Sequence, residues 1–432
     1  MSRSCRISVT PVFHSRNMTN EPAGPSVMNP QLPDRRPQHI TIVSETFPPE
    51  INGVANTLRH LCQGLIERGH KVTVVRPRQA HEQKGLFEST GDGLFSRELV
   101  VTGLPLPGYS DLQFGVSRPA TLTKLWKKGK PDAIYVATQG PLGIAAVSAA
   151  RKLGIPACSG FHTNFHSYSR YYGAGSLERL LCAYGRWFHN RTAITLVPTR
   201  KMQQVTHSMG ITPTGLWSRG VDCHRFSPHK RDSDLRKRWG LNDNDLAVLY
   251  VGRLAAEKNL RMAVACFERV RGMHPNARFV LVGDGPLGPQ LAERHPDYLF
   301  CGTQRGEDLA RHYASGDLFL FPSKTDTFGN VVLEAMASGL GLVAFDDAAA
   351  AEHIRHGENG LKVHLEDDDA FINQALRLAD QPTLLSRVRA QARLDALDLS
   401  WSSQIEQFEQ LVLNQPSKAR YHGINKQSIS LL

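Results

Sequence analysis

Two carboxylates bracket a loop and a helix start in the stretch TDTFGNVVLEAMASG, residues 325–339. The preceding apolar run, DLFLFP, has the length of a strand and ends at Pro322, and the apolar residues after the loop recur at helical spacing. Asp326 therefore belongs to the loop and Glu334 to the helix, with the N–H groups of the first helical turn between them. Such a place suits an anion flanked by a hydroxyl-rich group. The alternative is that both carboxylates only complement the helix dipole.

Two cations and a glycine turn follow neighbouring strand-like runs. In GRLAAEKNL, Arg253 comes directly after a strand, and Lys258 stands five residues later at a helix start. Because Arg offers a fork of donors and Lys a point charge, the pair can clamp a diphosphate. The alternative is two isolated surface charges.

The GDGP turn at 283–286 is compatible with a nucleotide passing close to the backbone, which makes Gly283 and Asp284 candidate donor-binding residues.

The N-terminal part of the chain offers a glycine and a histidine loop. The segment ETFPPEING leads into a helix whose first turn holds Asn52 and Gly53, and glycine lets a phosphate or a sugar approach the backbone. The loop SGFHTNFHSY presents His162 and His166 at a strand end. A histidine in such a loop is usually packed or solvated. It gains interest here because its loop is expected to face the same cleft as the other loops.

Alternating strand and helix patterns predict the elements that position these loops. HITIVSETFPP, a helical stripe and KVTVVRP form a crossover unit of a parallel sheet. The pattern restarts after SRGVDCHRFSP (218–228), with LAVLYVG, RFVLVGDG and GLVAF as strands. The sequence therefore predicts an α/β fold with two Rossmann-like, doubly wound halves facing each other across a cleft.

Length and composition set the domain organisation. At 432 residues, with 41% apolar and 21% charged residues, the chain is too long for one compact core. We expect a disordered leader at 1–38, Rossmann-like domains at 39–217 and 218–400, and a C-terminal helix and tail at 401–432. The seven cysteines are scattered and never paired as C-x-x-C, which argues against disulfides or a zinc site and favours the cytosol. No apolar run is long enough to span a bilayer.

The net charge of +11 is concentrated in one segment. Residues 121–210 contain twelve Lys or Arg and two acidic residues, a net charge of +10. The segment also holds seven aromatic residues: Trp126, Tyr168, Tyr171, Tyr172, Tyr184, Trp187 and Phe188. Basic residues mixed with aromatics are typical of surfaces that bind an anionic membrane or a nucleic acid. The alternative is a solvated face with aromatics in the core.

Six motifs in order carry a family resemblance: ETFPPEINGVANTLRHL, GFHTNFHSYSRYY, RGVD, VGRLAAEKNL, GDGP and TDTFGNVVLEAMASG. Together they resemble the retaining glycosyltransferases of family 4, which have the GT-B fold of two Rossmann domains. The resemblance covers the chain from residue 39 to about residue 400. It is strongest to the branch with sulfoquinovosyl- and glycosyl-diacylglycerol synthases and GDP-mannose-dependent mannosyltransferases.

The resemblance implies roles for the C-terminal half, which would hold the nucleotide sugar. Asp326 and Glu334 match the family's carboxylate pair, so the first would contact the donor sugar and the second the ribose. Arg253 and Lys258 match the basic pair that holds the diphosphate. Main-chain contacts are implied for Phe328, Gly329 and Asn330. Asp326 stands where the family usually has glutamate, one methylene longer.

The resemblance also implies roles for the N-terminal half, which would hold the acceptor. Gly53 matches a loop that closes on the distal phosphate, and His162 matches a histidine that contacts the donor sugar. A second departure from the family pattern is FDDAAAAEHIRHGENG, which replaces a Gly-Gly-containing loop before Glu352.

The expected activity is transfer of a hexose or uronic acid from a nucleotide sugar, with UDP-sugars favoured, to a lipid such as diacylglycerol. The alternative is a GDP-mannose-dependent alpha-mannosyltransferase acting on a glycan or polyprenyl-linked acceptor. A nucleotide-sugar 2-epimerase and a nucleic-acid-binding protein are further alternatives.

No Asp-x-Asp is placed to bring Mg²⁺, so we expect no metal and no cofactor besides the donor. The front-face attack that the resemblance implies needs no general base. We expect no nucleic-acid partner and a cytoplasmic, peripheral position at the inner face of the membrane; no pattern predicts an oligomeric state.

Overall fold

The structure is a computed structural model of the chain. It describes residues 36–50, 52–79, 82–88, 95–106, 109–162, 175–242, 244–324, 326 and 328–415. The predicted leader at 1–38 lies outside these ranges except for its last three residues, and so does the tail after residue 415. The two halves belong to one compact unit that begins at Gln38.

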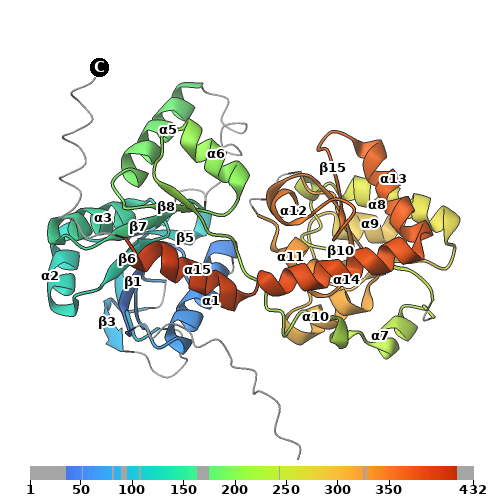
Figure 1. The fold of residues 1–432 in the computed structure, drawn as a ribbon, viewed down its shortest axis with the longest axis horizontal. Coiled ribbons are helices and arrows are strands. Elements are labelled where there is room, and N and C mark those ends of the chain that lie inside the picture. Colours follow the sequence, from blue (N-terminus) through green and yellow to red (C-terminus); the bar gives the residue numbers. More distant parts are fainter. Residues whose placement is uncertain are drawn as a thin grey trace, which may run out of the picture. The chain divides into compact units, whose positions relative to one another are not determined.

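The first half is a mainly parallel sheet covered by helices (Figure 1). Its strands lie in the order β3-β4-β2-β1-β6-β7-β8-β9, and β5 pairs with β4. The strands are β1 (His39–Val43), β2 (Lys71–Pro77), β3 (Gly85–Glu88), β4 (Arg97–Leu106), β5 (Tyr109–Val116), β6 (Ala133–Val136), β7 (Ala157–Gly160), β8 (Thr195–Val197) and β9 (Thr214–Leu216). The helices are α1 (Gly53–Glu67), α2 (Pro119–Gly129), α3 (Pro141–Leu153), α5 (Gly175–His189) and α6 (Arg200–Ser208).

The second half is built on a sheet in which every described pair of neighbours is parallel, in the order β12-β11-β10-β13-β14-β15. The strands are β10 (Ala247–Val251), β11 (Arg278–Val282), β12 (Leu299–Phe300), β13 (Leu318–Phe321), β14 (Gly341–Phe345) and β15 (Leu361–Val363). Its helices are η1 (Pro228–Lys230), α7 (Ser233–Arg238), η2 (Ala256–Lys258), α8 (Leu260–Met273), α9 (Gly288–Arg294), α10 (Gly306–Ser315), α11 (Asn330–Ala337), α12 (Ala348–His353), α13 (Asp368–Asp380) and α14 (Pro382–Asp398). A last helix, α15 (Trp401–Leu413), follows them in sequence.

Helix α1 illustrates how the sequence pattern produces these elements. Leu58, Leu61 and Leu65 recur at helical spacing and are fully buried against the first sheet. After the helix, Gly69 adopts a φ of 85°, a left-handed conformation that favours glycine and stops the helix. Strands β1 and β2 on either side pair in parallel. The predicted α/β fold with two Rossmann-like halves is confirmed.

Two features of the fold lie outside the sequence prediction. Strands β3, β4 and β5 extend the first sheet with antiparallel pairings that no pattern indicated. Helix α15 follows the second half in sequence but packs on the first half, where Phe408 is buried and the Glu409 carboxylate accepts hydrogen bonds from Arg68 at 2.7 and 3.0 Å. Helix α15 therefore packs beside α1 on the first half (Figure 1). Of the helices described here, none combines the length and the apolarity needed to cross a membrane.

Candidate active site

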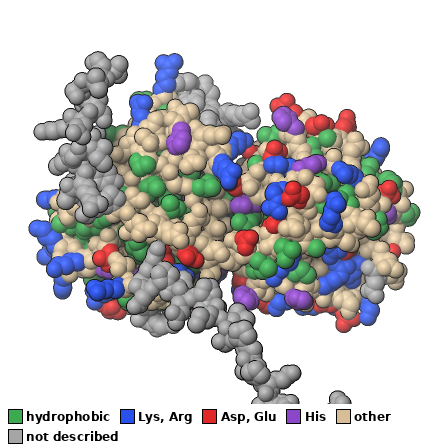
Figure 2. Space-filling model, in the orientation of Figure 1, with side chains coloured by type: hydrophobic (Ala, Val, Ile, Leu, Met, Phe, Trp, Pro, Cys, Tyr) green, Lys and Arg blue, Asp and Glu red, His purple; other side chains and the backbone are tan. Residues whose placement is uncertain are grey.

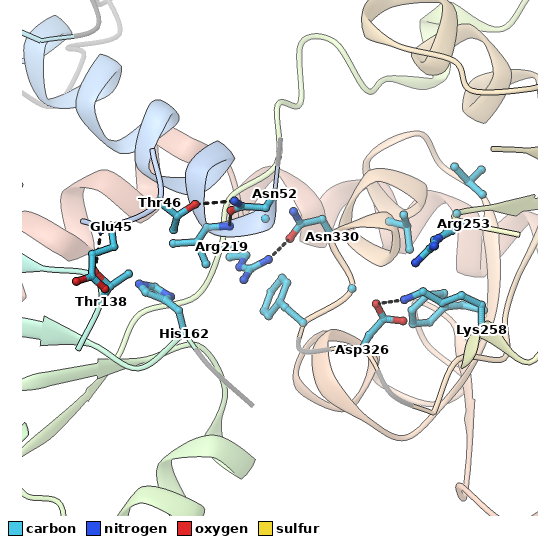
Figure 3. Close-up of a pocket in the computed structure, with 18 of the residues that line it drawn as sticks. Glu45, Thr46, Asn52, Thr138, His162, Arg219, Arg253, Lys258, Asp326 and Asn330 are labelled. Carbon is cyan, nitrogen blue, oxygen red and sulfur yellow. Dashed lines mark hydrogen bonds and ion pairs between the residues drawn. The ribbon is translucent and has the colours of Figure 1, made fainter. Parts of the chain in front are cut away.

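A cavity of about 700 Å³ lies between the two halves and is lined from both (Figure 3). Its walls come from the loops after β1, β6 and β7 in the first half and after β10 and β13 in the second. The carboxyl ends of parallel strands thus converge on one place, as open α/β sheets require. Eight predicted site residues line the cavity: Gly53, His162, Arg253, Lys258, Asp326, Phe328, Gly329 and Asn330.

Glu334 is not among the residues that line this cavity. It lies in α11, where the hydroxyl of Tyr313 donates a hydrogen bond to its Oε2 at 2.9 Å. Burial raises the pKa of Glu334, and the bond from Tyr313 only partly offsets that effect. The structure therefore separates the two predicted carboxylates, with Asp326 in the cavity wall and Glu334 behind it.

Gly283 and Asp284 also lie outside the cavity wall. A Cβ at Gly283 would come within 2.1 Å of the Gly252 carbonyl oxygen, so close backbone packing accounts for this glycine. Asp284 accepts hydrogen bonds from the amide and hydroxyl of Thr303 at 2.9 and 2.7 Å. Both residues thus have local structural partners.

Lys258 and Asp326 form an ion pair inside the cavity wall, with Lys258 Nζ 2.7 Å from Asp326 Oδ1. Each side chain is about one fifth exposed, at 22% and 19%. The other carboxylate oxygen, Oδ2, is buried and accepts no hydrogen bond from the described residues. The pair therefore places an ammonium group and a partly unsatisfied carboxylate at one point, where a ligand could contact either.

Arg253 stands beside this pair with a more open side chain. It is 67% exposed, and its Nη1 lies 3.6 Å from Glu257 Oε1. The hydroxyl of Tyr250 donates a hydrogen bond to the Arg253 carbonyl at 3.1 Å, which holds the loop after β10. Because an exposed arginine has many rotamers, Arg253 can swing toward a ligand without breaking buried contacts.

The N-terminus of α11 opens onto the same cavity. Its N-cap residue, Gly329, has a φ of 84° and supplies no side-chain hydrogen bond to the helix. A glycine suits this left-handed conformation, and a Cβ there would lie 3.0 Å from the Phe321 ring. The first N–H groups of α11 thus lack a side-chain cap and lie where the helix dipole favours an anion.

On the first-half wall, His162 is held by Tyr135. His162 Nε2 and the Tyr135 hydroxyl are hydrogen-bonded at 2.8 Å. Gly160 allows this contact, because a Cβ there would lie 2.3 Å from that hydroxyl and 2.4 Å from Nε2. Burial lowers the pKa of His162 to about 3, and the charge of Arg219 adds to the effect. The imidazole is therefore neutral at physiological pH and can serve as a hydrogen-bonding group, not as an acid.

Glu45 lines the cavity at the end of β1. Its Oε1 accepts a hydrogen bond from the Leu142 amide in the first turn of α3 at 3.1 Å, while its own amide donates to Thr138 Oγ1 at 2.9 Å. Gly140, the N-cap of α3, offers no side chain, so Glu45 caps this helix from another element. Burial raises the pKa of Glu45 to about 7 despite that bond.

The start of α1 brings Asn52 and Gly53 to the cavity. Asn52 caps the helix, since its Oδ1 accepts from the amides of Val54 and Ala55 at 3.1 and 2.9 Å. At Gly53, a Cβ would lie 3.0 Å from Nη1 of Arg219, so the absence of a side chain lets this guanidinium approach the helix (Figure 3).

Sequence reasoning missed Glu45 and Arg219 as cavity residues. Both stand inside the motifs ETFPPEING and RGVD, and Glu45 comes two residues after the end of β1. Ligands of open α/β sheets bind beyond the carboxyl ends of the strands, and this strand-end rule could therefore have identified Glu45. Arg219 lies in the segment that joins the two halves, where no such rule applies.

The basic, aromatic segment divides into two kinds of residue. Trp126 and Phe188 belong to the core, whereas Trp187 on α5 is 46% exposed and Leu180 on the same helix is 67% exposed. The Arg191 guanidinium carbon lies 4.9 Å from the Trp187 ring centre. Figure 2 shows Lys and Arg side chains gathered at the left edge, over α2. Tyr168, Tyr171 and Tyr172 lie outside the described residues.

Two family profiles match the chain, one in each half. "Glycosyltransferase Family 4" matches residues 51–225, and "Glycosyl transferases group 1" matches residues 245–381. Among solved structures, the chain is similar to the sucrose-phosphate synthase from Thermosynechococcus elongatus, with a TM-score of 0.68 at 18% identity over 87% of this chain and 98% of that one. That likeness supports the two-domain fold.

Curated relatives span most of the chain. A GDP-mannose-dependent alpha-mannosyltransferase from Corynebacterium glutamicum is 34% identical over 77% of this chain and 78% of its own length. The sulfoquinovosyl transferase SQD2 from Arabidopsis thaliana is 29% identical over 72% of this chain and 60% of its own. An alpha-monoglucosyldiacylglycerol synthase from Acholeplasma laidlawii is 24% identical over 82% and 92%. These relatives belong to the branch that the motifs predicted.

Proposed function

Because the chain belongs to glycosyltransferase family 4, with the GT-B fold, we propose that it transfers a hexose or uronic acid from a nucleotide sugar to a lipid acceptor. The observation that carries the proposal is one cavity lined by Lys258, Arg253 and the uncapped start of α11 on one side and by His162 on the other. Cations and helix N–H groups suit a departing diphosphate. A neutral histidine suits a sugar hydroxyl.

We propose that the reaction retains the configuration of the sugar, as the family resemblance implies. The bond between the anomeric carbon and the distal phosphate breaks, and the acceptor oxygen bonds to that carbon from the same face. The acceptor's proton passes to the departing phosphate oxygen, which removes the need for a protein base. Lys258 and Arg253 stabilise the negative charge that builds on the diphosphate. The same cations would let the reaction proceed without a metal, so turnover should persist in EDTA.

Helix α5 supports a lipid acceptor and a peripheral position on an anionic membrane surface. Leu180 and Trp187 are seven residues apart, so they share one face of the helix, and both are exposed. Arg186 and Arg191 flank Trp187 and can meet anionic headgroups. The names of the Arabidopsis and Acholeplasma relatives support the same class of acceptor. A cytoplasmic location, at the inner face of the membrane, is part of this proposal.

A second candidate is mannosyl transfer from GDP-mannose. Relatives from Corynebacterium glutamicum, Mycolicibacterium smegmatis and Mycobacterium tuberculosis, at 34%, 33% and 32% identity, carry the name GDP-mannose-dependent alpha-mannosyltransferase. Their names favour GDP-mannose over the UDP-sugars that the sequence analysis preferred. The acceptor would then be a glycan or a polyprenyl-linked sugar.

A donor and acceptor screen tests both candidates. The protein is incubated with GDP-mannose or a UDP-hexose, and with vesicles containing diacylglycerol or a polyprenyl-linked glycan, and the products are identified by mass. A hexosylated lipid that requires both substrates supports glycosyl transfer, and the donor that yields it decides between the candidates. Conversion of the nucleotide sugar without any acceptor would instead indicate an epimerase.

A further inference from the structure

The segment that joins the two halves carries an arginine at the centre of the cavity (Figure 3). Arg219 is 8% exposed. Its Nη1 donates a hydrogen bond to Asn330 Oδ1 at 3.3 Å, and its Cζ lies 5.2 Å from the Phe328 ring centre. The same nitrogen lies against Gly53 of the first half. One guanidinium therefore contacts the start of α1 and the start of α11.

This guanidinium is buried and forms no direct ion pair with a carboxylate of the described residues. The charge of Asp326 acts on it, but Asp326 is the ion-pair partner of Lys258. The Nε of Arg219 has no hydrogen-bond partner among the described residues. Arg236 is a contrast in charge pairing. It is also buried and its Nε also lacks a partner, but its Nη1 lies 2.9 Å from Asp317 Oδ2. Burial lowers the pKa of Arg219 to about 10, so the group still carries its charge at neutral pH. A buried charge without a directly paired counter-charge is expensive, and an anion bound beside it would offset that cost.

Two helix dipoles add to the positive potential at this point. Helix α1 begins at Gly53 and α11 begins at Asn330, and both residues line the cavity next to Arg219. The positive ends of these helices therefore lie beside an already unpaired cation. On the proposed function above, we infer that Arg219 binds a phosphate group of a substrate, and so joins the first half to the ligand held by the second.

The phosphate could come from either substrate of the proposed reaction. It is the distal phosphate of the donor if the diphosphate runs from Arg253 and Lys258 toward Arg219. It is a phosphate on the acceptor if the acceptor itself is phosphorylated. In both cases the guanidinium offers two parallel donors to phosphate oxygens, which an ammonium group cannot do.

The test measures binding by calorimetry for the wild type and for Arg219→Met, which removes the charge and keeps an unbranched apolar chain. The probes are inorganic pyrophosphate, GDP, UDP, GMP, UMP and glycerol 3-phosphate. If Arg219 holds the distal phosphate, the variant should bind pyrophosphate, GDP and UDP roughly 10- to 100-fold more weakly, with a smaller change for GMP and UMP. If it holds an acceptor phosphate, only glycerol 3-phosphate binding, measured with saturating GDP or UDP, should fall. Unchanged affinity for every probe would overturn the inference.

Stability without ligand separates this role from a merely structural one. If Arg219 only holds the two halves together, its removal should destabilise the protein. Removal of an unpaired cation kept for binding should not destabilise the protein, so Arg219→Met should melt at or above the temperature of the wild type. It should also lose the stabilisation by the probe that Arg219 binds, which is pyrophosphate for a donor phosphate and glycerol 3-phosphate, added with GDP or UDP, for an acceptor phosphate. A lower melting temperature together with normal stabilisation by both probes would contradict the inference.

Two further variants complete the design. Arg219→Lys keeps the charge and loses the fork, so its pyrophosphate affinity should lie between those of the wild type and Arg219→Met, and it replaces the methionine variant if that one fails to fold. Arg305→Met removes an exposed arginine outside the cavity and should bind as the wild type does. A wild type that binds neither GDP, UDP nor pyrophosphate refutes the proposed function. If the wild type binds GDP, UDP or pyrophosphate and Arg219→Met binds every probe, glycerol 3-phosphate included, as tightly as the wild type does, only the role of Arg219 is refuted.

Discussion

The second half contributes two cations, Arg253 and Lys258, and the start of α11 to the cavity wall, whereas the first half contributes His162 and Glu45. The cations and the helix dipole make the second wall strongly attractive to anions. On the first wall burial holds the pKa of His162 at about 3 and raises that of Glu45 to about 7, so neither group is firmly charged at neutral pH. The difference fits a division of labour in which one wall holds a diphosphate and the other meets sugar and acceptor hydroxyls.

The largest effect is expected from the charged wall. Lys258→Ala removes the cation of the Lys258–Asp326 pair, for which we propose a contact with the departing diphosphate, and turnover should fall by roughly 100- to 1000-fold. The rate is measured at saturating donor with the substrates that the screen identifies. Lys237→Ala, on a surface lysine that is 75% exposed, is the control and should keep wild-type turnover. A Lys258→Ala rate within a few-fold of the wild-type rate would contradict the proposal that the second-half wall binds the diphosphate.

On the neutral wall, Glu45→Gln should change the pH dependence of stability. Because burial raises the pKa of Glu45 from 4.5 to about 7, the folded protein holds this proton more tightly than the unfolded chain does. The wild type's free energy of unfolding should therefore fall, relative to that of Glu45→Gln, as the pH rises from 4.5 to 7, by up to about 3 kcal/mol. Urea unfolding at several pH values measures this difference, and the glutamine can still accept the bond from Leu142.

The control for this measurement is Glu366→Gln, at an exposed position. Its unfolding free energy should follow that of the wild type at every pH. A constant difference between wild type and Glu45→Gln across the range would show that Glu45 keeps its ordinary acidity, and the contrast between the two walls would weaken.

Asp326→Asn tests how the two walls share the ligand. The change removes the partner of Lys258, so GDP and UDP should bind several-fold more tightly, while turnover of the sugar nucleotide should fall roughly tenfold because a sugar contact is lost. Asp326→Glu keeps the ion pair and should retain activity; a change in its donor preference would show that the shorter side chain selects the sugar. If Asp326→Asn lost nucleotide binding and turnover to the same extent, Asp326 would contact the diphosphate and not the sugar.

The smallest effect concerns the exposed face of α5, for which we propose a membrane contact. Trp187→Ser removes an exposed aromatic ring from α5 and should weaken sedimentation with anionic vesicles by a few-fold. Leu394→Ser on α14 removes an apolar side chain of the second half that is 57% exposed and should leave vesicle binding unchanged. Equal binding by both variants and the wild type would remove α5 from the membrane contact.

The sequence predicted the parts of this molecule whose structure depends on neighbouring residues. Apolar periodicity indicated α1 and its parallel strands, and the strand-end rule brought Lys258, Asp326 and His162 to one cavity. Strand β4 escaped prediction because Gly103 and Pro105 interrupt its apolar pattern.

Contacts between distant segments were harder to foresee. The placement of α15 depends on Arg68 and Glu409, which are 341 residues apart. Arg219 lies in a connecting segment, and its environment exists only where α1 and α11 meet it. Glu334 was expected to contact the ribose because it matches the family's carboxylate pair. The sequence gives no sign that its carboxylate accepts a hydrogen bond from Tyr313, 21 residues away.

The most direct test of the division between the walls is a crystal structure with GDP or UDP, whichever binds more tightly. The account predicts the diphosphate within hydrogen-bonding distance of Lys258 Nζ and the first amides of α11, with the first-half wall at His162 and Glu45 left to the sugar and the acceptor. A diphosphate bound against His162 and Glu45, away from Lys258, would contradict it.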